Sequence, residues 1–337
     1  MPCLPAEWEH QSGVLISWPT KSTDWRDNLP EAETTYLELT KRITQYSHAY
    51  ICCNDAETRQ HVQKLCSDAN IPIKRYRLFT IPYDDTWTRD YGPISLRREN
   101  KIIWLNFEFN AWGGKYTHLQ DRQLTQSLYQ HFSNTRILEN IDFVLEGGSI
   151  DSDGEGTVLT TSQCLLDPAR NPGLTKKQIE DSLITSLEVK RILWLDHGHL
   201  LGDDTDAHID TLARFCNPNT IAYVQCTDST DPHFKSLSAM ELQLRSFKQV
   251  NGQAYNLIPL PLADACFNSE GQLLPASYAN FLIINDAVLV PVYGLDTDTP
   301  ALTQLQKAFP GHRIIPIQCR SLIEQFGSLH CITMQVL

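Results

Sequence analysis

Five short segments of the chain carry residue types that can do chemistry, each beside glycine or aromatic residues at the end of an expected element. They span residues 87–93, 109–116, 145–149, 202–210 and 329–333. Together they hold a thiol, two imidazoles and several carboxylates. A cysteine thiolate is a strong nucleophile, and a histidine can carry protons to and from a reacting group. Taken alone, however, Cys331 in its strand-like apolar run is typical of a buried, inert thiol.

The acidic and histidine residues each allow two interpretations. Asp90 precedes Tyr-Gly-Pro, so it either presents its carboxylate at a strand end or pairs with the neighbouring arginine in a turn. Glu146 follows an apolar pair and precedes two glycines, and a carboxylate there is costly unless it is paired, which favours a site. His208 and Asp210 fall on a short helix predicted over residues 206–215, where a lone histidine is more often structural.

Two other classes of protein are alternatives to a cysteine enzyme. His197, His199, His208 and Asp210 could form the H-x-H…H-x-D set of a metal-dependent amidohydrolase. The matching distal ligands are not evident, and the ten cysteines contain no C-x-x-C pair of the kind that binds zinc. We therefore expect no metal. A protein that binds a ligand without catalysis is the other alternative.

The composition is that of an ordinary globular protein. Hydrophobic residues make up 42% of the 337 residues and charged residues 20%, which excludes global disorder. The formal net charge of −12 argues against a nucleic-acid partner and suits a cationic small molecule. Because no signal peptide or apolar run of about 18 residues is present, we expect no membrane partner and a cytoplasmic protein. Most of its cysteines should then be reduced and buried.

An order of hairpin, helix and strand recurs three times along the chain. Its hairpins span 94–107, 149–161 and 281–292, its helices 121–132, 175–187 and 300–309, and its last strands 143–145, 192–195 and 314–317. A further helix is predicted near 232–250. Such a repeat fits either a closed array of ββαβ units or an ordinary α+β sheet. No linker divides the chain, so residues 1–337 are predicted to form a single catalytic domain.

The segments, in their order, resemble the agmatine deiminase family and its bacterial peptidylarginine deiminase relatives, within the guanidine-modifying (pentein) superfamily. The resemblance spans nearly the whole chain, and its further motifs lie at 5–9, 17–19, 161–167, 171–172, 278–281 and 330–333. It implies an α/β fold, a five-bladed α/β propeller of repeated ββαβ units. It also favours the closed array for the repeats described above.

The resemblance also implies roles for individual residues. Cys331 matches the family's nucleophile and His208 its general acid/base, while Glu146 matches the carboxylate that works with that histidine. Asp90 and Asp210 match the pair that holds the guanidinium. Trp87 lies where the family has an aromatic residue near the substrate. Separately from the resemblance, the acidic segment 202–206 could accept a distal ammonium, so Asp204 is expected to bind substrate there.

The implied reaction is hydrolytic deimination of agmatine to N-carbamoylputrescine and ammonia. Two aspartates can hold the planar guanidinium while a thiolate attacks its carbon, giving a covalent thiouronium intermediate that water then hydrolyses. No step requires a cofactor. Deimination of peptidylarginine or of another guanidino compound is the alternative, and family members often self-associate, so a homo-oligomer is compatible with the resemblance.

Two positions depart from the family pattern. The glycine-rich approach to the nucleophile reads Gln-Phe-Gly-Ser-Leu over residues 325–329, and the usual glycine before the histidine is Ala207. These departures affect the shape of the pocket rather than the chemistry.

Overall fold

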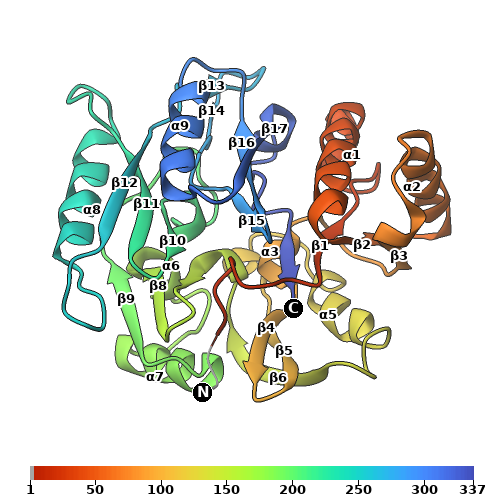
Figure 1. Ribbon diagram of the computed structural model, residues 1–337, viewed down its shortest axis with the longest axis horizontal. Helices are drawn as coiled ribbons and strands as arrows, with labels where there is room; N and C mark the ends of the chain where they lie inside the picture. Colours follow the sequence, from red (N-terminus) through yellow and green to blue (C-terminus); the bar gives the residue numbers. More distant parts are fainter. Residues whose placement is uncertain (1–3) are drawn as a thin grey trace.

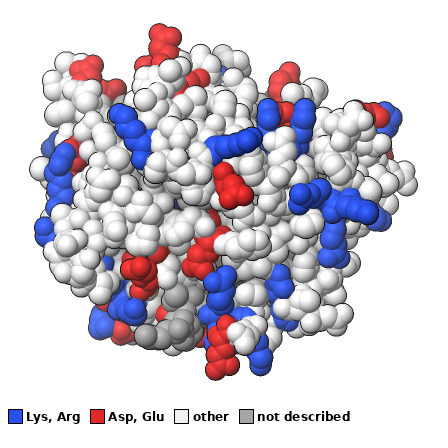
Figure 2. Space-filling model, viewed as in Figure 1, with Lys and Arg blue, Asp and Glu red and all other residues white. Residues whose placement is uncertain are grey.

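A computed structural model of the chain describes residues 4–337 and has a mixed α/β architecture. Strands lie toward the middle of the molecule and the long helices toward its outside (Figure 1). Acidic and basic residues are interspersed among uncharged areas on the face shown in Figure 2. No helix in the described part of the chain is long and apolar enough to cross a membrane.

Four three-stranded sheets among the described residues share one order, in which two antiparallel strands are followed by a third that is parallel to the second. The first two contain β4 (Ile94–Arg98), β5 (Lys101–Glu108) and β6 (Ile137–Val144), and β7 (Ile150–Ser152), β8 (Thr157–Thr161) and β9 (Arg191–Leu195). The other two contain β10 (Ala213–Asn217), β11 (Thr220–Gln225) and β12 (Asn256–Pro261), and β15 (Leu282–Ile284), β16 (Ala287–Val292) and β17 (Arg313–Gln318). A helix bridges each parallel pair, because parallel strands need a crossover.

A fifth, four-stranded sheet brings the two ends of the chain together. Its strands, in spatial order, are β18 (Met334–Val336), β1 (Gly13–Ser17), β2 (His48–Cys53) and β3 (Tyr76–Thr80). β18 is antiparallel to β1, and β1, β2 and β3 are mutually parallel. This sheet therefore repeats the order of the other four, with its first strand supplied by the end of the chain. A small hairpin, β13 (Cys266–Phe267) with β14 (Leu273–Leu274), stands apart.

The helices fall into long crossovers and short turns. The long ones are α1 (Leu29–Tyr46), α2 (Ala56–Asp68), α5 (Asp121–Tyr129), α7 (Lys176–Leu187), α8 (Phe234–Ser246) and α9 (Asp298–Ala308). The short ones are α3 (Thr88–Tyr91), α4 (Ala111–Gly114), α6 (Ser162–Leu165) and α10 (Arg320–Ile323), with 3-10 turns η1 (Asp24–Asn28), η2 (Ile73–Arg75), η3 (Gly147–Ser149) and η4 (Ile209–Thr211). Local sequence sets several of their starts. Thr175 and Gln178 form a capping box at the start of α7.

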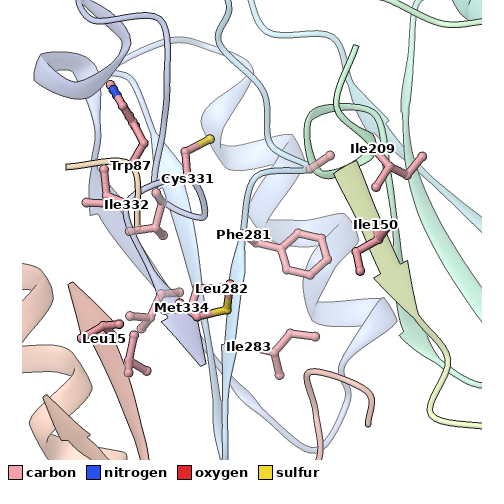
Figure 3. Packing of buried hydrophobic residues seen from close by; sticks show 14 of the residues in the cluster. Leu15, Trp87, Ile150, Ile209, Phe281, Leu282, Ile283, Cys331, Ile332 and Met334 are labelled. Carbon is pink, nitrogen blue, oxygen red and sulfur yellow. The ribbon is translucent and has the colours of Figure 1, made fainter. Parts of the chain in front are cut away.

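The core is continuous across the described residues, because strands such as β1, β8 and β16 are buried on both faces over most of their length. Figure 3 shows Cys331 at one end of a packed group of these residues, with Trp87 beside Ile332. Nine cysteines are described; all are reduced and buried, as predicted, and Cys3 lies outside the described residues.

The three predicted repeats are confirmed as β4–β5–α5–β6, β7–β8–α7–β9 and β15–β16–α9–β17, and the helix near 232–250 is α8. Three local predictions are wrong. The helix over 206–215 is instead a 3-10 turn followed by β10, because Asp206 and Ala207 both have φ of +64° and the buried residues of 213–216 pair with β11. Asp90 lies in the short helix α3 rather than at a strand end, and Cys331 lies in a turn before β18.

Candidate active site

One pocket of about 250 Å³ brings together residues from opposite ends of the chain. Four residues predicted from the sequence line it: Trp87, Asp90, Asp204 and Cys331. The other lining residues are Asp24, Asp85, Trp112, Tyr116, Thr205, Gln325, Phe326 and Gly327. The remaining predicted residues, Glu146, His208 and Asp210, lie directly behind Asp90 and are fully enclosed.

Cys331 is 7% exposed and lies in the turn between α10 and β18. Its thiol donates to the side-chain oxygen of Asn280 over 3.4 Å. Burial raises the pKa of Cys331 well above that of a free thiol, and the carboxylates of Asp210 and Asp90 raise it further. Without a ligand the thiol is therefore protonated, and a cation bound between those carboxylates would favour the thiolate.

Asp90 is held in place by two donors. The backbone N–H of Gly148 donates to its Oδ1 over 2.9 Å and the indole N–H of Trp112 to its Oδ2 over 2.9 Å. Burial raises the pKa of Asp90, and the neighbouring charges of Asp210 and Glu146 raise it further. The pairing of Asp90 with Arg89 that the sequence allowed does not occur, since Arg89 turns away toward Glu7 instead.

His208 and Asp210 reach the site from the turn around η4. Nδ1 of His208 lies 3.7 Å from Oδ1 of Asp90, and its Nε2 has no hydrogen-bond partner among the described residues. Burial lowers the pKa of His208 to about 3, so the free imidazole is neutral. Ala207 adopts φ of +64°, a conformation that favours glycine. This explains why the family that the sequence resembles usually has glycine at this position.

Glu146 ends the segment after β6 and is fully buried. Nε of Arg170 contacts both of its carboxylate oxygens, at 2.9 and 3.0 Å, and Nη1 of Arg170 reaches Asp206 at 2.9 Å. Burial raises the pKa of Glu146, while the Arg170 charge acts against that rise. The sequence favoured a charged partner for the buried Glu146 carboxylate. That partner is Arg170, 24 residues further along the chain.

The outer part of the pocket is acidic. The hydroxyl of Tyr116 donates to Asp204 over 2.6 Å, and Nζ of Lys115 lies 3.3 Å from the same carboxylate. Asp85 accepts from the indole N–H groups of Trp25 and Trp87, at 3.2 and 3.0 Å. Burial, opposed in part by these hydrogen bonds, raises the pKa of Asp85 to about 6.

Residues 325–327 of the segment 325–329, which departs from the family pattern, form part of the pocket lining. Phe326 has φ of +64°, and the Gly327 backbone packs on the Trp87 ring so closely that a Cβ there would lie 2.1 Å from a ring carbon. The unusual sequence of this segment therefore alters part of the pocket surface.

Several residues of the site were not assigned from the sequence. Asn280 accepts hydrogen bonds from the backbone and thiol of Cys331, Arg170 holds Glu146, and Trp112 holds Asp90. Trp112 and Asn280 do lie in segments singled out from the sequence, whereas nothing in the local pattern around Arg170 marks it.

Three ligand atoms that could hold a metal ion come together in the described part of the chain. They belong to Glu146, Cys164 and His208, and they lie within 4.8 Å of one another. The set of His197, His199, His208 and Asp210 raised by the sequence does not form such a group, and His199 hydrogen-bonds Ser236. Arg170 already contacts both oxygens of Glu146, which disfavours a second cation there.

The fold and the site together define a mixed α/β enzyme in which a thiol, an imidazole and carboxylates surround one acidic pocket. This set suits the modification of a cationic guanidino group. The chain belongs to the Porphyromonas-type peptidyl-arginine deiminase family, whose model matches residues 3–336, and it is therefore a guanidino-group deiminase.

Similar proteins match over almost their whole length. A candidate agmatine deiminase of Vibrio parahaemolyticus is 34% identical over 355 residues, covering 99% of this chain and 96% of the relative. The substrate-bound structure of a Cys-to-Ser variant of C. jejuni agmatine deiminase is 35% identical with a TM-score of 0.92, covering 100% of this chain and 96% of that one. A candidate arginine deiminase structure from Porphyromonas gingivalis is 43% identical with a TM-score of 0.92, covering 99% and 98%.

Proposed function

We propose that the protein hydrolyses agmatine to N-carbamoylputrescine and ammonia through a covalent adduct on Cys331. The observation that carries this proposal is the charge of the pocket. Four aspartates line it and, among the described lining residues, no lysine or arginine does. Such a pocket suits a ligand that is cationic at both ends. Agmatine carries a guanidinium at one end and an ammonium at the other.

Asp90 and Asp210 are proposed to hold the guanidinium. Their carboxylates approach the same point, since a Cβ built on Gly148 would lie 2.8 Å from Oδ1 of Asp90 and 3.0 Å from Oδ2 of Asp210. Oδ1 of Asp210 has no partner among the described residues and is free to accept from the ligand. Paired carboxylates match the planar fork of guanidinium N–H donors and fix its orientation. Asp204, at the outer end, would take the ammonium in addition to its contacts with Tyr116 and Lys115.

Cys331 would become nucleophilic only when substrate binds. The carboxylates that raise its pKa are the ones that the guanidinium would neutralise. The thiol proton passes to neutral His208, and the sulfur adds to the guanidinium carbon. His208 then returns this proton to an NH₂ group, the carbon–nitrogen bond breaks, and ammonia leaves a thiouronium on Cys331.

Hydrolysis uses the same two residues. His208 takes a proton from water, and the hydroxide adds to the thiouronium carbon. The carbon–sulfur bond breaks, the hydroxyl proton passes to sulfur to regenerate the Cys331 thiol, and the product leaves with a neutral urea group. His208 gives its proton to ammonia and becomes neutral again. Glu146, immobilised by Arg170, would orient His208 and stabilise its protonated form. The protons balance, because the substrate cation and water yield the urea and an ammonium ion.

We also propose that residues 1–337 form one catalytic domain in which the five similar sheets close into a five-bladed α/β propeller. Supporting this, β18 pairs with β1, so the fifth sheet joins the end of the chain to its beginning. The site residues come from the turns that follow strands of different sheets, as a shared central axis would require.

Agmatine should exceed arginine in kcat/KM by about 100-fold or more, and arginine should exceed an N-blocked arginine amide. An α-carboxylate would face aspartates, and such like-charge contacts cost several kcal/mol. The blocked amide lacks that carboxylate but also lacks any ammonium that Asp204 could bind. Initial ammonia release from the three compounds at equal concentration tests this. The 43% identical candidate arginine deiminase gives the competing expectation. If arginine or the blocked amide reacts fastest, the proposed deimination is correct but agmatine is not the preferred substrate.

Activity should be unchanged by EDTA. The thiol, imidazole and carboxylates suffice for the proposed steps, and the one cluster of ligand atoms in the described residues is already neutralised by Arg170. Ammonia release would be measured before and after dialysis against the chelator, together with zinc content. Loss of activity that zinc restores would contradict the mechanism and favour a metal-dependent amidohydrolase.

A further inference from the structure

A second group of buried charged residues lies behind the pocket without lining it. Its members are Glu7, Arg89, Asp151, Arg214 and His330, and none is more than 8% exposed. The steps proposed above use none of them. One of them, His330, nevertheless contacts a residue of the site.

The ring of His330 bridges two carboxylates. Its Nδ1 lies 2.7 Å from Oδ2 of Asp210, and its Nε2 lies 2.7 Å from Oε2 of Glu7. The backbone is also fixed here, because the N–H of His330 donates to Oδ1 of Asn280 over 2.8 Å. A ring held at both nitrogens and at its backbone has one orientation, and it transmits that orientation to Asp210.

Glu7, at the far side of the ring, is itself immobilised. Nη2 of Arg214 lies 2.8 Å from its Oε2, and the backbone N–H of Ile283 donates to its Oε1 over 2.6 Å. Nε of Arg214 in turn contacts Asp151 at 3.1 Å. Burial alone would raise the pKa of Glu7, but the charges of Arg214 and His330 outweigh it and hold that pKa well below its usual range. Glu7 is therefore an ionised, fixed support.

Asp210 is held on one oxygen only. His330 occupies Oδ2, whereas Oδ1, although buried, has no partner among the described residues. This contact restricts rotation of the carboxylate, so that its free oxygen keeps one preferred direction. Without the His330 contact, rotation of Asp210 would cost the site the fixed geometry that orients a guanidinium carbon toward sulfur.

We propose that His330 is a positioning residue, which fixes the Asp210 carboxylate for guanidinium binding and is itself supported by Glu7 and Arg214. The proposal rests on the proposed function, in which Asp210 holds the substrate. His330 does not line the pocket and acts only through Asp210. Residues of this kind typically affect function by 10- to 100-fold.

Two substitutions separate the contacts of His330, because an asparagine amide lies near the position of Nδ1 and a glutamine amide near that of Nε2. His330→Asn can still donate to Asp210 but loses Glu7, whereas His330→Gln keeps Glu7 and loses Asp210. We expect His330→Gln to lower kcat/KM for agmatine by about 30-fold or more, mainly through KM, and His330→Asn to lower it by less than about fivefold. In the Cys331→Ala background, the agmatine Kd measured by calorimetry should follow the same order.

Stability should follow the opposite order. Glutamine keeps the contact with the Glu7–Arg214 pair, so thermal unfolding should leave His330→Gln at least as stable as His330→Asn. If His330 had only a structural role, the less stable of the two variants would also be the less active one. That result would overturn the proposal. His233→Gln removes another buried histidine–aspartate contact, of 2.8 Å to Asp231, and should leave kcat/KM unchanged.

Ligand-free crystal structures of the two variants separate this inference from the proposed function. We expect Asp210 to be rotated in His330→Gln and in place in His330→Asn. An unmoved Asp210 in both variants overturns the inference even if agmatine is turned over. Absence of ammonia release from every guanidino compound by the wild-type protein overturns the proposed function, while the crystal structures still decide whether His330 positions Asp210.

Discussion

Replacing Cys331 with alanine is expected to lower ammonia release from agmatine by at least about 1,000-fold while the protein stays folded, because loss of a covalent nucleophile removes the whole reaction path. Among the described cysteines, Cys331 alone lines the pocket that contains Asp90. Removing one sulfur from the edge of a pocket costs little packing energy. The measurement is initial ammonia release, with thermal unfolding to establish that the variant is folded.

Cys226→Ala is the matched control, since Cys226 has the same 7% exposure as Cys331 but lines a different cavity. It should keep near-normal activity. An acid quench of the wild-type reaction should also leave a mass adduct on the peptide that contains Cys331. Near-normal turnover by Cys331→Ala would refute covalent catalysis at this residue. An adduct on Cys319 or Cys266 would show that one of these residues is the nucleophile instead.

The repeats could be predicted because their signals are local. The hairpins of β4–β5, β7–β8 and β15–β16 are each closed by a short polar turn that contains positive φ, at Glu99, at Gly154 and Gly156, and at Asn285 respectively. Amphipathic crossover helices follow these hairpins. The fifth sheet was not predicted, because its first strand, β18, pairs with β1 from the other end of the chain, more than 300 residues away. No local pattern encodes that pairing.

The same contrast between local signals and long-range contacts applies to the residues of the site. The roles of the residues at positions 90, 146, 208, 210 and 331 could be predicted by resemblance. These residues lie close together in the structure. Their supports could not be assigned, because each is defined by a tertiary contact. Arg170 holds Glu146, and His330 connects Asp210 with Glu7, which lies 323 residues from His330 in the sequence. Turns with positive φ, as at Ala207, likewise misled the helix prediction over 206–215.

Gly148→Ala should lower kcat/KM by about 100-fold or more, although it adds only one methyl group. A Cβ at this position would lie 2.7 Å from Nδ1 of His208, 2.8 Å from Oδ1 of Asp90 and 3.0 Å from Oδ2 of Asp210. These are three of the groups proposed to bind the guanidinium and move its protons, so none can retreat without leaving the productive geometry. Displacements of about 1 Å in such groups cost about 100-fold in rate. Initial rates of ammonia release over a range of agmatine concentrations give both kcat and KM.

Gly311→Ala is the control for this substitution, because a Cβ there meets no atom within 4 Å and the residue has no positive φ. It should leave both activity and thermal stability close to those of the wild type. Gly148→Ala should remain folded, since each of the three crowded groups ends a side chain that can move slightly, and its loss of activity should therefore exceed any change in stability. If Gly148→Ala is as active as Gly311→Ala, then His208, Asp90 and Asp210 tolerate displacement, and the proposal that they form one rigid guanidinium site is wrong.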